Sequence, residues 1–265
     1  MGFKKNTGGS NFKTSNFTYS SFVGLVIHSD ERKLYDETLK SAGISDSDIK
    51  KGFGTDESFK ARKALAESGI SGYRLSGKLG YLAVREKDLG KEGKPNLQKF
   101  LTVGLSDGED TMYLEVAVQH AAASALARKL VNVKPGDEVE VNLFATKSEN
   151  GFGNHAAEVK SAGVEVPGIG YKDGPGPVIE AKLKALEAAG ITDRDVISKT
   201  RSAASGEYVE GIVSAVGPAF EAFHAENRKS GKTAADAPAK SDAVQDGDFM
   251  FSESDFEEGG GHPAP

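Results

Sequence analysis

The feature that most constrains the fold of this chain lies between residues 81 and 154, where four segments alternate apolar and polar side chains. Alternation with a period of two residues is typical of strands that bury only one of their faces. An alanine-rich segment with helical spacing of its leucines separates the third segment from the fourth. The sequence therefore predicts strands at 81–86, 98–105, 111–118 and 139–144 and a helix at 120–131.

The alternation also predicts which side chains face water, because neighbouring side chains in a strand point to opposite faces of the sheet. One set is wholly apolar and is expected to form the core: Leu82, Val84, Leu101, Val103, Leu105, Met112, Leu114, Val116, Val118, Val139, Val141 and Leu143. The opposite set is expected to face outward: Tyr81, Arg85, Phe100, Thr102, Tyr113 and Phe144. Four aromatic rings and a guanidinium on a face that should meet water indicate a binding surface.

The composition limits the class of protein. The 265 residues are 38% hydrophobic, which is enough to fill a globular core, and no apolar run approaches the roughly 18 residues that a membrane span needs. The absence of cysteine excludes disulfides, thiolate zinc sites and cysteine nucleophiles, and it fits a reducing compartment. The amino terminus has no apolar signal core, so we expect a cytoplasmic protein.

Charge is distributed unevenly along the chain. The formal net charge is −6, but residues 241–265 contain seven acidic residues and no lysine or arginine. Residues 1–240 therefore hold 33 basic and 32 acidic side chains, a net charge of +1. The acidity belongs to the carboxyl-terminal tail, and the body of the chain is close to neutral.

Residues 1–21 are rich in Gly, Ser, Thr and Asn and contain no acidic residue. Three lysines are interleaved with four aromatic rings: Lys4, Lys5, Lys13, Phe3, Phe12, Phe17 and Tyr19. Such a segment is expected to be a flexible arm that clamps a polyanion, with cations against phosphates and rings against bases. The alternative is a leader whose aromatic side chains dock on the body of the protein.

Residues 22–227 are expected to form one domain around the predicted strands. A short apolar strand at 22–27 leads into a helical insertion at 30–70, in which Asp30 and Asp56 are expected to cap helices that end near Ser41 and Glu67. The sequence leaves open whether the later helices pack on the strands or form a homo-oligomer face. These helices are predicted at 178–189, 192–205 and 207–227, within a helical region of 178–227, and residues 167–177 before them are predicted as a linker or long turn.

Two distant segments repeat one helix-ending device. Gly43 and Gly190 each follow a helical segment and precede an isoleucine and then a Ser or Thr. A glycine that ends a helix, an apolar anchor and a capping hydroxyl are typical of a turn between two helices. The acids that follow, Asp46, Asp48, Asp193 and Asp195, are alternatively metal ligands. Capping is the favoured interpretation, because no histidine or further acidic cluster adjoins them.

The predicted order of elements over residues 73–166 is three strands, a helix and two strands, the last at 156–166. This order resembles the OB-fold, a small five-stranded barrel whose helix lies between strands three and four. The resemblance implies an α+β protein with an OB-like β-barrel, flanking helices and disordered termini. It also implies that strands two and three, with the first-to-second and fourth-to-fifth loops, bind oligonucleotides on their outer face.

The side chains on that face predict which residues contact a nucleic acid. Single-stranded nucleic acid exposes bases that stack on rings, while Lys and Arg neutralise its backbone. The expected stacking residues are Tyr81, Phe100, Tyr113 and Phe152. The expected neutralising residues are Arg85, Lys87, Lys91, Lys94, Lys99 and Lys147. In the alternative interpretation the helices at 30–70 or 178–226 cover the rings and the lysine loop is a solvated turn. Glu115 and Glu140 share the outer face and oppose a polyanion.

Residues 228–240 are typical of a flexible linker, and they lead to an acidic stretch with phenylalanines at 246–258. This stretch resembles the disordered acidic tails of single-stranded DNA-binding proteins of bacteria and of phage T7-type replication systems. The resemblance implies that the tail recruits polymerase, helicase or primase and competes with DNA for the groove. Its charges would be Asp246, Asp248, Asp255, Glu257 and Glu258, and its anchors Phe249, Phe251 and Phe256. The stretch is followed by residues 259–265 rather than ending the chain, and the alternative role is solubility.

Signals for an enzyme are weak, because the five histidines are isolated and no phosphate-cradling or nucleophile-elbow motif occurs. We therefore expect a non-enzymatic protein without cofactor or metal that binds single-stranded DNA independently of sequence. It would belong to a bacteriophage replication, recombination or repair system and act in the cytoplasm of the bacterial host. Two alternatives are a protein-interaction adaptor with the barrel as scaffold and a nuclease with carboxylate-bound metal. The sequence does not separate DNA from RNA.

Overall fold

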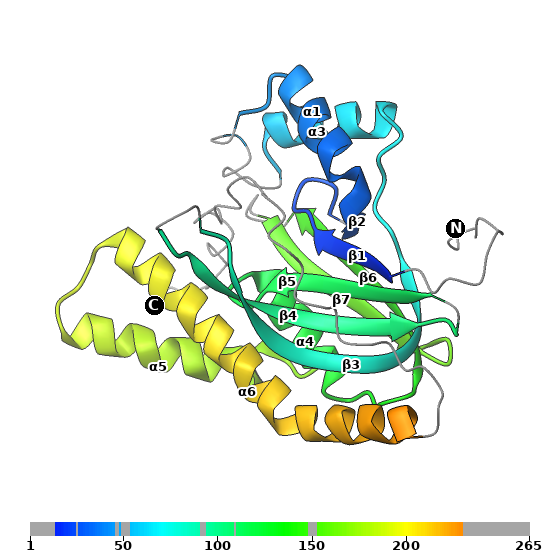
Figure 1. Cartoon of the computed structure of the whole chain (residues 1–265). Coiled ribbons are helices and arrows are strands. Elements are labelled where there is room, and N and C mark those ends of the chain that lie inside the picture. The colour runs from blue at the N-terminus through cyan, green and yellow to red at the C-terminus, as the bar shows by residue number, and fades with distance from the viewer. Residues whose placement is uncertain are drawn as a thin grey trace.

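The computed structural model describes residues 14–24, 26–45, 48, 54–90, 94–108, 110–147 and 153–229. In this part of the chain the protein is α+β, with eight strands in one mixed sheet of order β2-β1-β5-β4-β3-β6-β7-β8 and five α-helices. Figure 1 shows α1 and α3 together beyond one side of the sheet and α5 and α6 along another. The strands are β1 (Thr14–Tyr19), β2 (Val26–His28), β3 (Leu75–Asp88), β4 (Leu97–Ser106), β5 (Thr111–Ala117), β6 (Glu138–Lys147), β7 (Gly153–Ser161) and β8 (Val164–Glu165). The helices are α1 (Arg32–Ser41), α3 (Asp56–Glu67), α4 (Ala121–Leu130), α5 (Pro175–Ala188) and α6 (Arg194–Lys229).

The strands predicted from alternation are present. β3, β4 and β6 contain the first, second and fourth alternating segments, β5 contains the third except for Val118, and α4 lies between β5 and β6 as predicted. The fifth predicted strand is shifted toward the amino terminus, because β7 already ends at Ser161. Ala162 and Gly163 follow with φ of 50° and 79°, and this turn separates β7 from the short β8.

The apolar set predicted to face inward forms the main core. All its members are buried except Val84, which is half-buried against the same cluster. Helix α4 adds Leu126 and Leu130 to this core, and α6 adds Val209 and Phe220. The core face predicted from the sequence is therefore confirmed.

Strand β3 is the longest described strand, and it pairs with β6 on one side and with β4 on the other. Its first residues, 75–78, pair with β6, and residues 78–88 pair with β4. The register with β4 shifts across Gly80, so a bulge lies at a glycine, as is typical of glycine inside a strand.

We expect Gly77→Ala to lower the free energy of unfolding by about 1–2 kcal/mol. A Cβ at Gly77 would come within 2.8 Å of the backbone oxygen of Ser106, which cannot rotate away. Gly80→Ala is the matched control, because no heavy atom lies within 4 Å of its Cβ position, and it should change stability by at most about 0.5 kcal/mol. Urea denaturation measures both variants, and equal losses would contradict a close crossing at Gly77.

The amino-terminal segment differs from the prediction. Residues 14–19 form β1, which pairs in parallel with β5 and antiparallel with β2. Phe17 and Tyr19 are buried in the main core, and the hydroxyl of Tyr19 is hydrogen-bonded to His155 Nδ1 of β7 at 2.7 Å. A flexible arm is therefore wrong for residues 14–19, where alternate side chains point into the core. The alternative, docking of the aromatic side chains, holds there, whereas residues 1–13 lie outside the described residues.

The predicted helical insertion forms a second, separate core. Tyr35 and Leu39 of α1 and Leu65 of α3 are buried around Phe22 and Ile27. This cluster shares no member with the main core. The two helices are thus stabilised by contacts with each other and with the β1–β2 connection.

The helix ends follow the predicted device in most respects. Gly43 and Gly190 have φ of 71° and 72°, and the backbone N–H of the isoleucine after each glycine donates to a carbonyl of the preceding helix. Asp193 accepts hydrogen bonds from two backbone N–H groups in the first turn of α6, so capping accounts for its carboxylate. Helix α3 is capped by the hydroxyl of Thr55 rather than by Asp56, which lies in its first turn.

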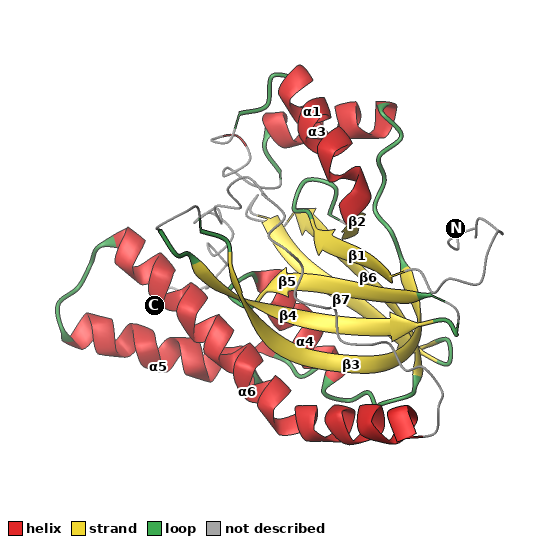
Figure 2. Cartoon of the chain, viewed as in Figure 1, coloured by secondary structure: helices red, strands yellow, loops and turns green. Residues whose placement is uncertain are grey.

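The carboxyl-terminal region contains one helix fewer than predicted (Figure 2). The sequence predicts separate helices at 192–205 and 207–227, but α6 is continuous over both. Gly206 allows α6 to approach the sheet, since a Cβ there would lie 3.3 Å from Val118 Cγ2. Segment 167–177 is not a linker, because Ile169 N–H donates to the α4 carbonyl of Arg128 and Gly174 is buried. No helix in the described ranges has the length and apolarity to cross a bilayer.

Candidate nucleic-acid interface

The candidate interface is the outer face of β3, β4 and β5, which is the side of these strands opposite the main core. The pairing register places its side chains in rows across the three strands. The rows are Tyr81, Gly104 and Tyr113; then Ala83, Thr102 and Glu115; then Arg85, Phe100 and Ala117. Segments far apart in the sequence thus meet on one surface.

Four of the predicted side chains lie together where this face is half-exposed, and we call them the Phe100 patch: Tyr81, Arg85, Lys87 and Phe100. Arg85 Nε donates a hydrogen bond of 2.8 Å to the hydroxyl of Tyr81, and its guanidinium carbon lies 5.1 Å from that ring's centroid. Lys87 Nζ lies 5.7 Å from the centroid of Phe100. The patch joins two rings and two cations, which is the chemistry that base stacking and phosphate neutralisation require.

An acidic residue on the same face holds Lys87. Its Nζ donates to Glu115 Oε2 of β5 at 2.5 Å, so the lysine side chain reaches across β4 and lies against Phe100. The side chain of Glu115 is 11% exposed. A phosphate that binds here therefore competes with Glu115 for Lys87.

Tyr113 is not exposed, and the expectation that it stacks a base is corrected. Its relative exposure is 0%, and its ring lies on Gly104, where a Cβ would come within 3.0 Å of ring atom Cε1. The Tyr81 ring meets it edge-on, with centroids 6.1 Å apart. Thr102 of β4 and Ala117 of β5 are buried as well, so the outer face is covered along β5 and half-exposed along β3. The signal in the sequence was Gly104, because a glycine inside an alternating strand indicates close approach of a neighbour.

The remaining predicted cations are not part of the patch. Lys99 shares the inward parity of Leu101, and its Nζ donates to Glu210 of α6 at 2.7 Å. That hydrogen bond raises the pKa of Lys99, with a further contribution from the negative charges of Glu210 and Glu86. Lys94, in the segment before β4, and Lys147, the last residue of β6, are exposed and form no ion pair with a described residue. Lys91, Phe152 and the acidic tail lie outside the described residues.

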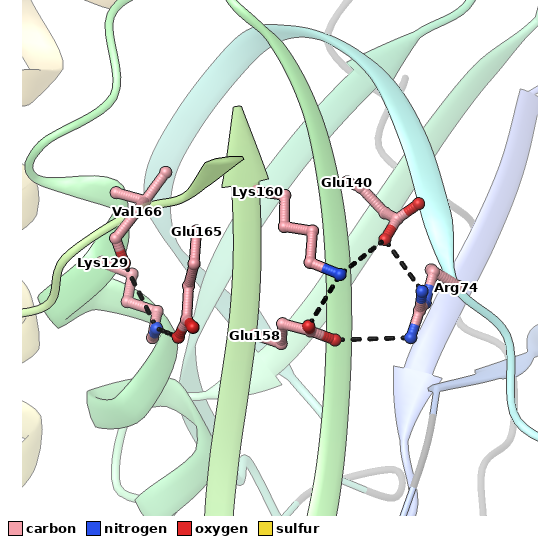
Figure 3. A network of polar contacts seen from close by, with 7 residues as sticks. All are labelled: Arg74, Lys129, Glu140, Glu158, Lys160, Glu165 and Val166. Carbon is pink, nitrogen blue, oxygen red and sulfur yellow. Dashed lines mark hydrogen bonds and ion pairs between the residues drawn. The ribbon is translucent and has the colours of Figure 1, made fainter. Parts of the chain in front are cut away.

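The acids on the outer side of β6 and β7 are balanced by cations (Figure 3). Arg74 bonds Glu140 at 3.0 Å and Glu158 at 3.3 Å, and Lys160 lies 2.9 Å from Glu158 and 4.0 Å from Glu140. The hydrogen bond from Lys160 is the main cause of a lowered pKa for Glu158. Glu140 therefore opposes a polyanion less than its charge alone suggests.

Helix α6 approaches the Phe100 patch from one side. The His224 ring lies 6.5 Å from the Tyr81 ring at an interplanar angle of 72°. The alternative in which carboxyl-terminal helices cover the outward rings thus holds at one edge of Tyr81. Gln98 is a further candidate that sequence reasoning missed, since it lies opposite Lys87 and its Oε1 is buried without a hydrogen bond to a described residue.

Among the described residues, no group of three or more His, Asp or Glu side chains is placed to hold a metal ion. No protein-family model matches the sequence, and no curated protein matches it. Functional inference therefore depends on the geometry of the outer face.

Proposed function

We propose that this chain binds single-stranded DNA, independently of sequence, on the Phe100 patch. The observation that carries the proposal is the half-exposed ring of Phe100 with the cations of Arg85 and Lys87 beside it. Bases of a single strand expose flat faces that stack on such rings, whereas the bases of a duplex already stack on each other. Stacking is worth about 1–3 kcal/mol per base and tolerates any sequence.

We further assign β3 to β7 with α4 to an OB-like barrel. β3, β4 and β5 are consecutive antiparallel strands, and β6 returns after α4 to lie beside β3, which is the strand order of a Greek key. The OB-fold is a five-stranded, partly open barrel of this kind. Two observations support the assignment. β1 pairs with the edge of β5 that β4 leaves free. A hydrogen bond between Tyr19 of β1 and His155 of β7 then links β1 to the last strand of the set. In such a barrel Phe100 lies on strand two, and Lys94 and Lys147 lie beside the two binding loops.

The proposed mechanism divides the work between rings and cations. Tyr81 and Phe100 stack bases, and Arg85, Lys87, Lys94 and Lys147 neutralise the phosphates. Lys91 is kept as a proposed neutralising residue, and Phe152 as a proposed stacking residue, from the sequence alone. Lys87 exchanges Glu115 for a phosphate when the strand binds, which exposes the ring of Phe100.

The acidic segment 246–258 completes the proposal. Its carboxylates would compete with phosphates for the same cations, and its phenylalanines would anchor a replication protein such as a polymerase, helicase or primase. The protein would then act in a bacteriophage replication, recombination or repair system in the host cytoplasm.

The test is a titration of fluorescent oligo-dT with the full chain and with a version that ends at Lys240, at low and moderate salt. We expect affinity to fall with a slope of about −3 in log–log form if all four cations contact phosphates. The shortened chain should bind more tightly. A strand that binds neither protein at low salt would sink the proposal, and an oligo-rU titration shows whether RNA binds equally well.

We expect Glu115→Gln to raise the affinity for single-stranded DNA by roughly 2- to 5-fold, because a partly exposed ion pair is worth about 0.2–1 kcal/mol. In the variant, Lys87 no longer gives up a carboxylate partner when it contacts a phosphate, and the salt dependence should stay close to that of the wild-type chain. Glu140→Gln is the control, because Glu140 pairs with Arg74 and Lys160 rather than with the patch. Unchanged affinity of Glu115→Gln would contradict the exchange of Glu115 for a phosphate at Lys87.

A further inference from the structure

Helix α6 borders the proposed DNA-binding surface along one side. It packs against β3 and α4, and Figure 1 shows its carboxyl-terminal half, drawn in orange, beside β3. Strand β3 carries Tyr81, Arg85 and Lys87 of the Phe100 patch. A nucleic-acid strand that binds on the patch therefore passes close to α6.

Two phenylalanines hold this part of α6 in place. Phe220 is buried in the main core. The ring of Phe223 lies against Gly136, where a Cβ would come within 2.9 Å of ring atom Cε2. Gly136 in turn donates its N–H to the carbonyl of Leu79 in β3 at 2.8 Å. The next residue of α6, His224, is therefore held in a fixed position relative to β3.

His224 meets the patch at Tyr81. The centroids of the two rings are 6.5 Å apart, and the interplanar angle is 72°. Both side chains are half-exposed, in contrast to the buried ring of Phe220. The helix thus presents a polar ring at the edge of the patch, next to the two phenylalanines that anchor it.

The angle between the rings determines which part of a nucleotide His224 contacts. A base that stacks on Tyr81 lies parallel to that ring. The base would stand at about the same 72° to the imidazole, so His224 meets its edge and does not stack on it. Base edges carry hydrogen-bond donors and acceptors, and a neutral imidazole offers one of each through its two ring nitrogens. One ring nitrogen is enough for the base, so the other can keep a contact within the protein.

The charges around the patch favour the same orientation of the strand. Glu221 and Glu226 of α6 are exposed, whereas the cations Arg85 and Lys87 are on β3. Carboxylates repel phosphates, so the backbone of the strand is favoured over β3 and the edges of the bases are favoured toward α6.

We propose that His224 belongs to the DNA-binding site, where it forms a hydrogen bond with the edge of the base that stacks on Tyr81. His224 has this role only if the patch binds DNA, so the proposal rests on the proposed function. It extends the site from β4 across β3 to α6. Every base presents donors or acceptors at its edge, so the contact agrees with binding that is independent of sequence.

The test is a titration of oligo-dT at low salt with variants of the full chain at position 224. His224→Phe keeps a ring beside Tyr81 but removes both ring nitrogens, and it should weaken binding about 3- to 10-fold, the effect of one lost hydrogen bond. His224→Gln, whose amide also donates and accepts, should bind within about twofold of the wild-type chain. Ser214→Ala is the matched control, because Ser214 is exposed on α6 about 15 Å before His224.

A double-mutant cycle with Tyr81→Ala shows whether the two residues contact the same nucleotide. Once the base is no longer held on Tyr81, His224→Phe should have little further effect. Wild-type affinity of His224→Phe, equal losses in His224→Phe and His224→Gln, or additive losses in the cycle would each overturn the proposal. Melting of each variant without DNA shows that it is folded.

The failure of this proposal is distinguishable from the failure of the proposed function. If Phe100→Ala weakens binding and His224→Phe does not, His224 is outside the site while the patch still binds DNA. A wild-type chain that binds no oligo-dT would overturn both proposals.

Discussion

Replacing Phe100 by alanine is expected to weaken binding of oligo-dT by roughly 5- to 150-fold, which corresponds to the loss of about 1–3 kcal/mol of stacking on one base. Phe100 is half-exposed on β4, directly opposite Arg85 and against Lys87. The variant should lose little stability, because the ring lies outside the main core. Fluorescence titration at low salt measures the change in affinity.

Phe144→Ala is the matched control for this variant. Phe144 is also an outward-facing, half-exposed phenylalanine, but it lies on β6 opposite Ala156 rather than in the Phe100 patch. Its loss should leave the affinity for oligo-dT unchanged within about twofold, since no base stacks on it. Equal losses from the two variants would mean that the effect of Phe100→Ala is not specific to the patch.

Tyr113→Ala is expected to lower the free energy of unfolding by about 3–5 kcal/mol, the range for deletion of a fully buried aromatic ring. The ring is 0% exposed and fills the space above Gly104, so its removal leaves a cavity between Tyr81 and the backbone of β4. Chemical denaturation measures the loss. Phe100→Ala and Tyr113→Ala therefore separate a stacking ring from a core ring on the same face of the sheet.

Tyr113→Phe supplies the control, because it keeps the ring and removes only the hydroxyl. It should cost much less stability than Tyr113→Ala. If Tyr113→Ala retained wild-type stability and lost affinity for DNA, Tyr113 would return to the set of stacking residues.

The elements that the sequence predicted well are those with a strict period. Alternation placed β3 to β6 and identified the buried face, since a half-buried strand must alternate. The predicted break between residues 205 and 207 falls at Gly206, yet α6 continues through it. There, contacts with β3 and α4 hold the helix, and the glycine serves a close approach to Val118. Tertiary packing thus overrides the local signal.

The candidate site was only partly predictable for the same reason. The alternation of side chains along the strands correctly predicted that Tyr81, Arg85 and Phe100 share one face. Alternation does not predict which other elements cover that face. The pocket that Arg128 and Arg201 line was not predicted at all. Its arginines are 73 positions apart on α4 and α6, and no local pattern links Arg128 to Arg201. Only the packing of the two helices brings them together.

The most direct test of the account is photo-crosslinking of the full chain to an oligo-dT that carries bromodeoxyuridine, followed by mass spectrometry of the peptides. The account predicts adducts on Phe100 and Tyr81, within residues 75–106, and their loss when unlabelled oligo-dT competes. Crosslinks confined to residues 121–229, with none on β3 or β4, would contradict binding at the Phe100 patch.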